Sequence, residues 1–203
     1  MYFETNPFDQ SLLVLLNQKW RCGLMDALAP VLSSPALLAT ILVGVAGWAL
    51  WRHGRRSLLV FLLLLAGFGL SDQGTNLLKH TFQRVRPLNA QAGIHYVEDG
   101  RWQVRPDDFA PTKTDGTSYP SAHAANTASL ALLGMYLWRR GRPWLLLLPL
   151  LTGYSRVYLG KHYPSDVVGG WLFGFLVAGT LGCLWHLYVR PRLRPRTGTG
   201  AHS

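Results

Sequence analysis

Five long apolar blocks dominate this sequence and constrain the fold more than any other feature. They are Pro35 to Trp51, Ser57 to Leu70, Ala122 to Trp138, Trp144 to Tyr154 and Val167 to Val189. A membrane-spanning helix needs roughly 20 mainly apolar residues, with about 17 as the lower end. The second and fourth blocks reach that length only by continuing through polar residues to about Leu78 and Tyr158. A chain of 203 residues is too small to bury five such helices in a soluble core, so we expect an all-α, polytopic membrane helical bundle.

Positive charge is distributed asymmetrically between the segments that connect these blocks. One set of segments contains no carboxylate and ten arginines: Arg52, Arg55, Arg56, Arg139, Arg140, Arg142, Arg190, Arg192, Arg194 and Arg196. The formal net charge of +10 therefore lies on one face. Because short cytoplasmic loops retain Lys and Arg, we expect that face to be cytoplasmic. The N-terminus, the loop from about Lys79 to Pro120 and the turn around Lys161 would then face the periplasm of a bacterial inner membrane.

The blocks indicate one integral membrane domain over residues 1–189. A basic cytoplasmic tail over residues 190–203 follows, and we expect it to be disordered. Ser11 to Trp20 has leucines ahead of polar residues, which predicts an amphipathic helix lying at the membrane interface before the first span. A sixth membrane helix there is the alternative. The only cysteines, Cys22 and Cys183, lie far apart in this topology and do not indicate a disulfide framework.

The high net charge raises the question of nucleic acid binding, which basic proteins often show. Here the arginines flank membrane spans and are not interleaved with stacking aromatic residues. We therefore expect the bilayer, and no nucleic acid, as a partner. The sequence carries no indication of oligomeric state.

Polar residues gather at the outer ends of the expected spans, where their high energetic cost makes them informative. Asp72 and Lys79 fall on one face of the second span. That face leads to Arg84 and Arg86 just outside. The third span opens with Tyr119 to His123, where a proline favours a helix start and the following backbone amides are unpaired donors. We therefore expect the functional site at the outer ends of the spans.

Three fixed cations are expected at the same depth there: Lys79, Arg86 and Arg156 at the end of the fourth span. A short turn then brings His162 and Asp166 into the start of the fifth span. Half-buried cations need an anionic partner, and few carboxylates are available. A phosphoryl group fits a cradle of arginine, lysine, hydroxyl and helix N-terminal amide donors. A metal ion fits worse, because the histidines lack a carboxylate or thiolate cluster at ligand spacing.

These residues form a pattern of three parts. In chain order it consists of Lys79 followed after six residues by Arg86-Pro87, then Pro120-Ser121-Ala122-His123, then Ser155-Arg156 with five residues before His162 and three before Asp166. The pattern resembles the signature of the type-2 phosphatidic acid phosphatase superfamily, which also includes the vanadium haloperoxidases. The resemblance covers about Ser57 to Val189. It implies an active-site core built as a helical bundle and catalysis without a metal or other cofactor.

Matching by position, the resemblance also implies roles for individual residues. His162 would be the nucleophile that forms a phosphohistidine, Asp166 its orienting partner and His123 the general acid. The phosphate oxygens would be held by Lys79, Arg86, Ser121, Ala122 and Arg156. The family usually has glycine at the position of Ala122. Its methyl group takes up space in the pocket, although a helical backbone can still present its amide.

The expected function is that of a membrane lipid phosphate or diphosphate phosphatase. The substrate would enter from the outer leaflet, because the cations lie near headgroup depth. By resemblance the candidate substrates are undecaprenyl diphosphate, the lipid A 1-phosphate, phosphatidylglycerol phosphate and phosphatidic acid. Three alternatives remain at this point. They are a phosphotransferase that passes the phosphate to a lipid acceptor, a haloperoxidase and a non-catalytic membrane scaffold. The known architecture of the haloperoxidases is soluble, which argues against the second.

Overall fold

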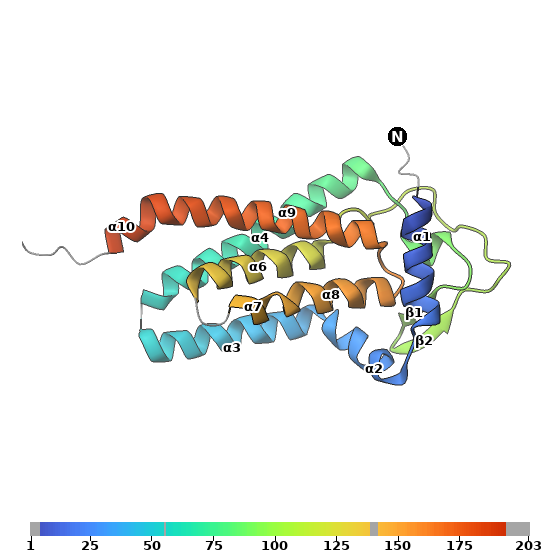
Figure 1. The fold of residues 1–203 in the computed structure, drawn as a ribbon, viewed down its shortest axis with the longest axis horizontal. Coiled ribbons are helices and arrows are strands. Elements are labelled where there is room, and N and C mark those ends of the chain that lie inside the picture. The colour runs from blue at the N-terminus through green and yellow to red at the C-terminus, as the bar shows by residue number, and fades with distance from the viewer. Residues whose placement is uncertain (1–4, 55, 139–141, 194–203) are drawn as a thin grey trace, which may run out of the picture.

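The computed structural model describes residues 5–54, 56–138 and 142–193, and it is an elongated bundle of helices. The helices that run along its long axis are α3 (Pro35–His53), α4 (Arg56–Phe82), α6 (Ala122–Leu137), α8 (Leu147–Tyr158) and α9 (Pro164–Leu184) (Figure 1). The short α7 (Arg142–Leu145) precedes α8. The expected all-α membrane bundle is confirmed.

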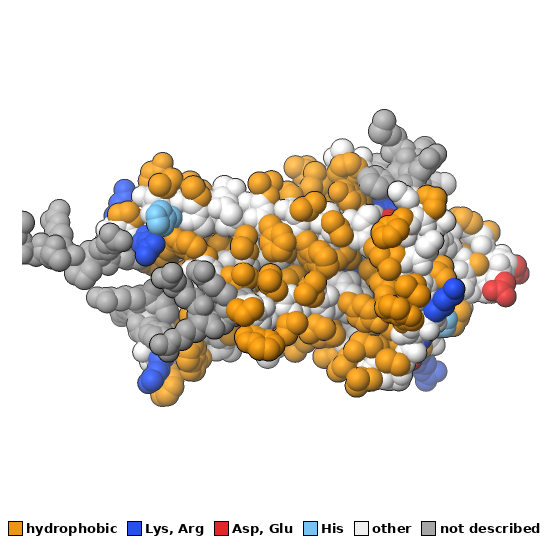
Figure 2. Space-filling view, viewed as in Figure 1, with side chains coloured by type: hydrophobic (Ala, Val, Ile, Leu, Met, Phe, Trp, Pro, Cys, Tyr) orange, Lys and Arg blue, Asp and Glu red, His pale blue; other side chains and the backbone are white. Residues whose placement is uncertain are grey.

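Three of the helical segments are long and apolar enough to cross a membrane: residues 35–52, 57–90 and 164–192. Helices α6 and α8 are shorter, with 16 and 12 residues, and pack between the longer ones. Large apolar side chains such as Val43, Leu62 and Leu172 are exposed on the outside of the bundle. Figure 2 shows that such side chains cover the middle of the molecule, while the charged groups visible on this face lie toward its two ends. A lipid-facing surface requires this distribution.

Helix α6 is the central element, and its tight packing against α9 determines where the polar ends meet. Its first two turns carry small buried residues, including Ala124 and Ala125. Gly174 faces them on α9, and a Cβ atom at this position would lie 2.2 Å from the carbonyl oxygen of Ala125. The close backbone approach that small residues permit brings the N-termini of the two helices together. The backbone N–H of Ser121 donates to the carbonyl oxygen of Asp166 at 2.9 Å there.

Short elements cover the end of the bundle at which these N-termini lie (Figure 1). They are α1 (Pro7–Val14), the π-helical turn η1 (Leu15–Lys19), α2 (Gly23–Leu32), α5 (Pro87–Ala90) and the antiparallel hairpin of β1 (His95–Glu98) and β2 (Arg101–Val104). In the hairpin, Val97 pairs with Trp102. We expected a loop after Lys79 and did not predict this hairpin, although Asp99 and Gly100, both at positive φ, form the two-residue turn that an Asp-Gly pair favours.

The N-terminal helix is present as expected, but it packs on protein. It begins at Pro7, earlier than predicted, and continues through η1 to Lys19. Leu13 is fully buried in a cluster with Ile94. Asn17 is also fully buried: its side-chain amide donates to the carbonyl oxygens of His95 at 2.8 Å and of Tyr158 at 2.7 Å. Because these buried polar groups need partners, the helix is anchored to the bundle end.

At the other end of the molecule, the last helical segment extends beyond the expected start of the tail. Helix α9 continues through η3 (Trp185–Val189) into α10 (Arg190–Leu193), so the first residues of the expected disordered tail are helical. The guanidinium of Arg192 donates to the carbonyl oxygen of Tyr188 at 2.9 Å, and a cation near a helix C-terminus is favourable. The rest of the tail, residues 194–203, and Arg55, Arg139 and Arg140 lie outside the described residues.

The orientation in the membrane remains a prediction from the arginine distribution, and cysteine labelling tests it. In a background with Cys22 and Cys183 replaced by serine, Arg101→Cys on the hairpin should react with a membrane-impermeant thiol reagent in intact cells. Arg52→Cys at the end of α3 should react only after the membrane is opened. Both positions are exposed in the folded chain. The opposite labelling pattern would invert the topology.

Candidate active site

Backbone hydrogen bonds join the three parts of the signature at the end of the bundle that α1, α2 and the hairpin cover. The N–H of Leu88 donates to the carbonyl oxygen of Gly160 at 3.1 Å, which connects the segment after α4 to the turn after α8. The N–H of Ser118 donates to the carbonyl oxygen of Arg84 at 2.9 Å, which connects the segments before α6 and after α4. Residues far apart in sequence therefore converge on one site.

His162 lies in the turn between α8 and α9 and is buried, with 2% of its surface exposed. Its Nδ1 lies 2.8 Å from the carbonyl oxygen of Ser118. Because a carbonyl oxygen can only accept, Nδ1 carries the proton and Nε2 keeps its lone pair. Asp166, the expected orienting partner, lies farther away, with its Oδ2 3.6 Å from Nδ1, at ion-pair distance. The structure thus gives the hydrogen-bond acceptor role to a main-chain group, because Ser118 lies closer to the imidazole.

The environment of His162 keeps the imidazole neutral. Burial is the largest of the effects that lower its pKa to about 4; the neighbouring charges of Arg156 and Arg86 act in the same direction, whereas Asp166 acts to raise it. A group with this pKa is unprotonated at neutral pH, so its Nε2 is available as a nucleophile.

Asp166 is fully buried and held by three donors. Its Oδ1 accepts from Nη1 of Arg84 at 2.6 Å, and its Oδ2 accepts from the Ser118 hydroxyl at 2.5 Å and from the N–H of Tyr163 at 2.9 Å. The sequence pattern named Arg84 as one of the cations after the second span but gave it no role. Ser118 carried no sequence signal at all.

The three cations of the expected cradle are present at the same end. Arg156 is buried in the last turn of α8, and Lys79 and Arg86 are half-buried. Within the described part of the chain, no ion pair joins any of the three to a carboxylate. Lys79 donates to the amide oxygen of Asn76 at 3.3 Å, and Arg86 donates to the hydroxyl of Thr117 at 3.5 Å. Cations without a counterion at this depth indicate an anionic ligand.

His123 and Ser121 lie at the start of α6. The Ser121 hydroxyl is buried and caps this helix by accepting from the N–H of Ala124 at 3.5 Å. His123 is half-buried and interacts electrostatically with Arg156, His162 and Lys79, which places it beside the cradle. Ala122, the first residue of the helix, is buried between them.

Lys161 is a fourth cation at the site that the sequence pattern did not assign. It precedes His162 and is half-buried. Its backbone N–H donates to the carbonyl oxygen of Arg156 at 3.1 Å. Burial lowers the pKa of its ammonium group, and the charges of Arg156 and Arg86 lower it further. Its charge adds to the excess of positive potential around the cradle.

Two cavities of opposite character adjoin these residues. A polar cavity of about 840 Å³ is lined by Lys79, Arg86 and the loop of residues 111–117. An apolar groove of about 410 Å³ lies between α3 and α4 and is lined by residues such as Leu42 and Phe68. His123 lines the polar end of the groove, together with the Asp72 and Asn126 pair. The site therefore borders both spaces, because Lys79 and Arg86 line the polar cavity and His123 lines the apolar groove.

Comparison with known proteins identifies the family. Residues 57–191 match the PAP2 superfamily, which is the superfamily that the three-part signature indicates. The chain belongs to the PAP2 superfamily. This match includes every residue of the signature and excludes α1, α2 and α3.

Several curated relatives of this PAP2 protein are named phosphatases. It is 29% identical over 176 residues to the phosphatidylglycerophosphatase B of Bacillus subtilis, a match that covers 81% of this chain and 75% of the relative. It is 31% identical over 140 residues to the lipid A 4'-phosphatase of Bacteroides thetaiotaomicron, which covers 61% of this chain and 56% of the relative. The PAP2 protein described here is an enzyme of this phosphatase class.

Solved structures show the same fold. The crystal structure of LpxE from Aquifex aeolicus superposes with a TM-score of 0.69 at 22% identity, covering 89% of this chain and 98% of LpxE. The crystal structure of a transmembrane PAP2-type phosphatidylglycerolphosphate phosphatase from Bacillus subtilis superposes with a TM-score of 0.64 at 20% identity, covering 94% and 90%. The bundle therefore has the fold of PAP2 membrane proteins.

Proposed function

We propose that this protein is an integral membrane phosphatase that removes a phosphate group from a lipid phosphate or diphosphate through a phosphohistidine. The observation that carries this proposal is the set of three cations around a buried, neutral His162, none of which pairs with a carboxylate in the part of the chain that the structure describes. A phosphoryl group supplies the charge that the cradle lacks. Its equatorial oxygens would be bound by Lys79, Arg86 and Arg156, the Ser121 hydroxyl and the amides at Ala122.

The proposed reaction has two steps. In the first, Nε2 of His162 forms a bond to phosphorus while the bond from phosphorus to the lipid oxygen breaks, and His123 protonates that oxygen. The carbonyl oxygen of Ser118 holds the Nδ1 proton, and Asp166 stabilises the positive charge that the imidazole gains. In the second step His123 removes a proton from water, which attacks the phosphohistidine and releases inorganic phosphate and the neutral imidazole. Positioning and charge stabilisation provide most of the rate acceleration.

Among the residues that the structure describes, His, Cys, Asp and Glu side chains form no group of three or more that is placed to hold a metal ion. The proposed chemistry needs none, because the fixed cations neutralise the phosphate. Metal independence is part of the proposal.

The two cavities support a lipid substrate. The apolar groove reaches His123, which the proposal assigns to the departing oxygen, so the lipid chain would lie in the groove between α3 and α4. The polar cavity beside Lys79 and Arg86 would admit water and release phosphate. Undecaprenyl diphosphate, the lipid A 1-phosphate, phosphatidylglycerol phosphate and phosphatidic acid all combine an apolar chain with a terminal phosphate. With the predicted orientation, the site would open to the periplasmic side of the inner membrane.

The direct test is phosphate release by the protein purified in detergent from a panel of these four lipids. We expect release from at least one of them, and water as the acceptor. Transfer of phosphate to an added lipid acceptor, without release into water, would instead identify a phosphotransferase. Failure to release or transfer phosphate from every member would contradict the proposed function.

Metal independence and the in-line mechanism give a further expected result. Hydrolysis should be unchanged in excess EDTA, because the cradle consists of side-chain and backbone donors. Vanadate should inhibit it, because its trigonal-bipyramidal adduct resembles the transition state and binds the same donors. The measurement is the rate of phosphate release with each reagent. An activity lost in EDTA and restored by a divalent cation would exclude the mechanism.

A further inference from the structure

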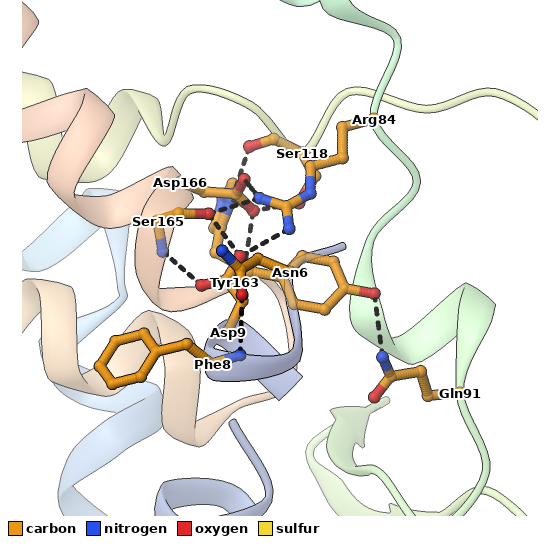
Figure 3. Close-up of polar contacts among 10 residues, drawn as sticks. Asn6, Phe8, Asp9, Arg84, Gln91, Ser118, Tyr163, Ser165 and Asp166 are labelled. Atoms are coloured by element: carbon orange, nitrogen blue, oxygen red, sulfur yellow. Dashed lines mark hydrogen bonds and ion pairs between the residues drawn. The ribbon is translucent and has the colours of Figure 1, made fainter. Parts of the chain in front are cut away.

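A buried charge network lies behind the site and reaches outside the matched family region. Arg84 is 3% exposed and bridges two carboxylates. Its Nη1 donates to Oδ1 of Asp166 and its Nη2 donates to Oδ2 of Asp9, each at 2.6 Å (Figure 3). Asp9 lies on α1, which precedes the matched residues 57–191, and is itself 3% exposed. The N-terminal helix therefore contributes a buried charge next to the signature residues.

Ser165 completes the network at the N-terminus of α9. Its N–H donates to Oδ1 of Asp9 at 2.8 Å, and its hydroxyl donates to Oδ2 of the same carboxylate. The hydroxyl also accepts from Nη1 of Arg84 at 2.6 Å. The guanidinium of Arg84 stacks over the Tyr163 ring, 4.0 Å from its centroid. Charge-assisted hydrogen bonds of this kind orient both partners strongly.

Helix α1 is a firm support for Asp9. The amide oxygen of Asn6 caps the helix by accepting from the N–H of Phe8 at 3.0 Å, as Figure 3 shows. Leu13 packs in the core cluster with Tyr163 and Val167. The hydrogen bonds of Asn17 to the hairpin and to α8 fix the following turn. Asp9 therefore reaches Arg84 from the buried face of an element that is anchored to the bundle.

We propose that Asp9 is a positioning residue, which acts through Arg84 to hold Asp166 in place. This inference rests on the proposed function, because it gives Asp166 a role in the chemistry of His162. The contacts form a continuous chain: Asp9 orients Arg84, Arg84 orients Asp166, and Asp166 accepts from the hydroxyl of Ser118, whose carbonyl oxygen accepts the Nδ1 proton of His162. A shift of Arg84 would move both groups that orient the imidazole.

Asp9→Asn tests this role, because asparagine keeps the shape of the side chain and removes its charge. Misplacement of reacting groups by about 1 Å can reduce a rate by about 100-fold, so we expect kcat to fall by about 10-fold to 100-fold. KM and the inhibition constant of inorganic phosphate should change by less than about twofold, because Asp9 makes no contact with the proposed phosphate ligands. Asp26→Asn is the matched control. It alters the Arg21–Asp26 ion pair at the same end of the bundle, and kcat should stay at the wild-type value.

A double-mutant cycle separates positioning from a purely structural role. If Asp9 acts through Arg84, Asp9→Asn should reduce kcat no further in an Arg84→Gln background than Arg84→Gln does alone. The inference would be overturned if the falls in kcat of the two single variants multiply in the double variant. A wild-type kcat in folded Asp9→Asn would overturn it as well. Thermal unfolding in detergent establishes that each variant is folded, and a lower unfolding temperature with unchanged kcat would mean a structural role only.

Ser165→Ala provides a second variant if Asp9→Asn does not fold. It removes the hydroxyl between Asp9 and Arg84 and keeps all three charges. We expect a fall in kcat of a few-fold with KM unchanged, and an unchanged kcat would overturn the inference. All of these rates are compared with the wild type on the same lipid. A wild type that releases no phosphate would contradict the proposed function itself, whereas an active wild type with unaffected variants would contradict only the role of Asp9.

Discussion

His162→Ala is expected to abolish phosphate release from every substrate, whereas the effect of His123→Ala should depend on the leaving group. Without Nε2 of His162 no bond to phosphorus forms, so we expect a loss of more than about 10⁴-fold whatever group departs. His123 protonates the departing oxygen in the proposed reaction. General acid catalysis contributes about 10²-fold to 10⁴-fold for a poor alkoxide leaving group and much less for an activated phenolate. His123→Ala should therefore lose far more activity on a lipid monophosphate than on an aryl phosphate.

The measurement is the ratio of variant to wild-type rate on both substrates, with an assay for acid-labile phosphoenzyme. His123→Ala should accumulate phosphohistidine on the aryl phosphate, because activation of water in the second step also fails. Equal losses on the two substrates would make His123 a binding residue. Phosphoenzyme formed by His162→Ala would place the nucleophile elsewhere. His80→Ala is a control, because His80 lines the wall of the polar cavity and the proposed steps do not use it.

Arg156→Lys is expected to reduce kcat/KM by about 10²-fold to 10³-fold although the charge is kept. A guanidinium presents a planar fork of donors to two phosphate oxygens, and a compact ammonium cannot reproduce it. The buried position of Arg156 at the end of α8 leaves little freedom for a shorter group to compensate. Arg52→Lys, on the opposite end of the molecule, is the matched control and should have wild-type kinetics. Near-normal turnover of Arg156→Lys would mean that this side chain does not bind the phosphate.

The sequence alone indicated the bundle and its chemistry because both signals are local. Apolar blocks of spanning length predict helices wherever they occur, and the predicted third span, from Ala122 to Trp138, agrees with α6 to within one residue. Lys79 with Arg86, and His162 with Asp166, are close in sequence, so helix and turn geometry is enough to bring each pair to the same end. The roles of these residues remain predictions that the experiments above test.

The contacts that hold Asp166 became visible only in the folded chain. The hairpin of β1 and β2 was missed because its strands carry no strong alternation of apolar and polar residues, although the Asp99-Gly100 turn that joins them and fixes their register is readable in the sequence. The acceptor of the His162 proton is a backbone carbonyl of Ser118, and every residue has such a group, so no residue type could mark it.

The class of molecule follows from local sequence features: the length of the apolar blocks predicts the membrane bundle, and the one-sided arginines predict its orientation. Which polar groups meet in the interior, in contrast, depends on how the helices pack. Asp9 and Arg84 are 75 residues apart and Asp9 and Ser165 are 156 residues apart, yet they share one buried network. Such pairing depends on how α1 packs on α9. Because a buried charge is tolerated only where its partners are already in place, the packing of the whole end of the bundle selects the partners.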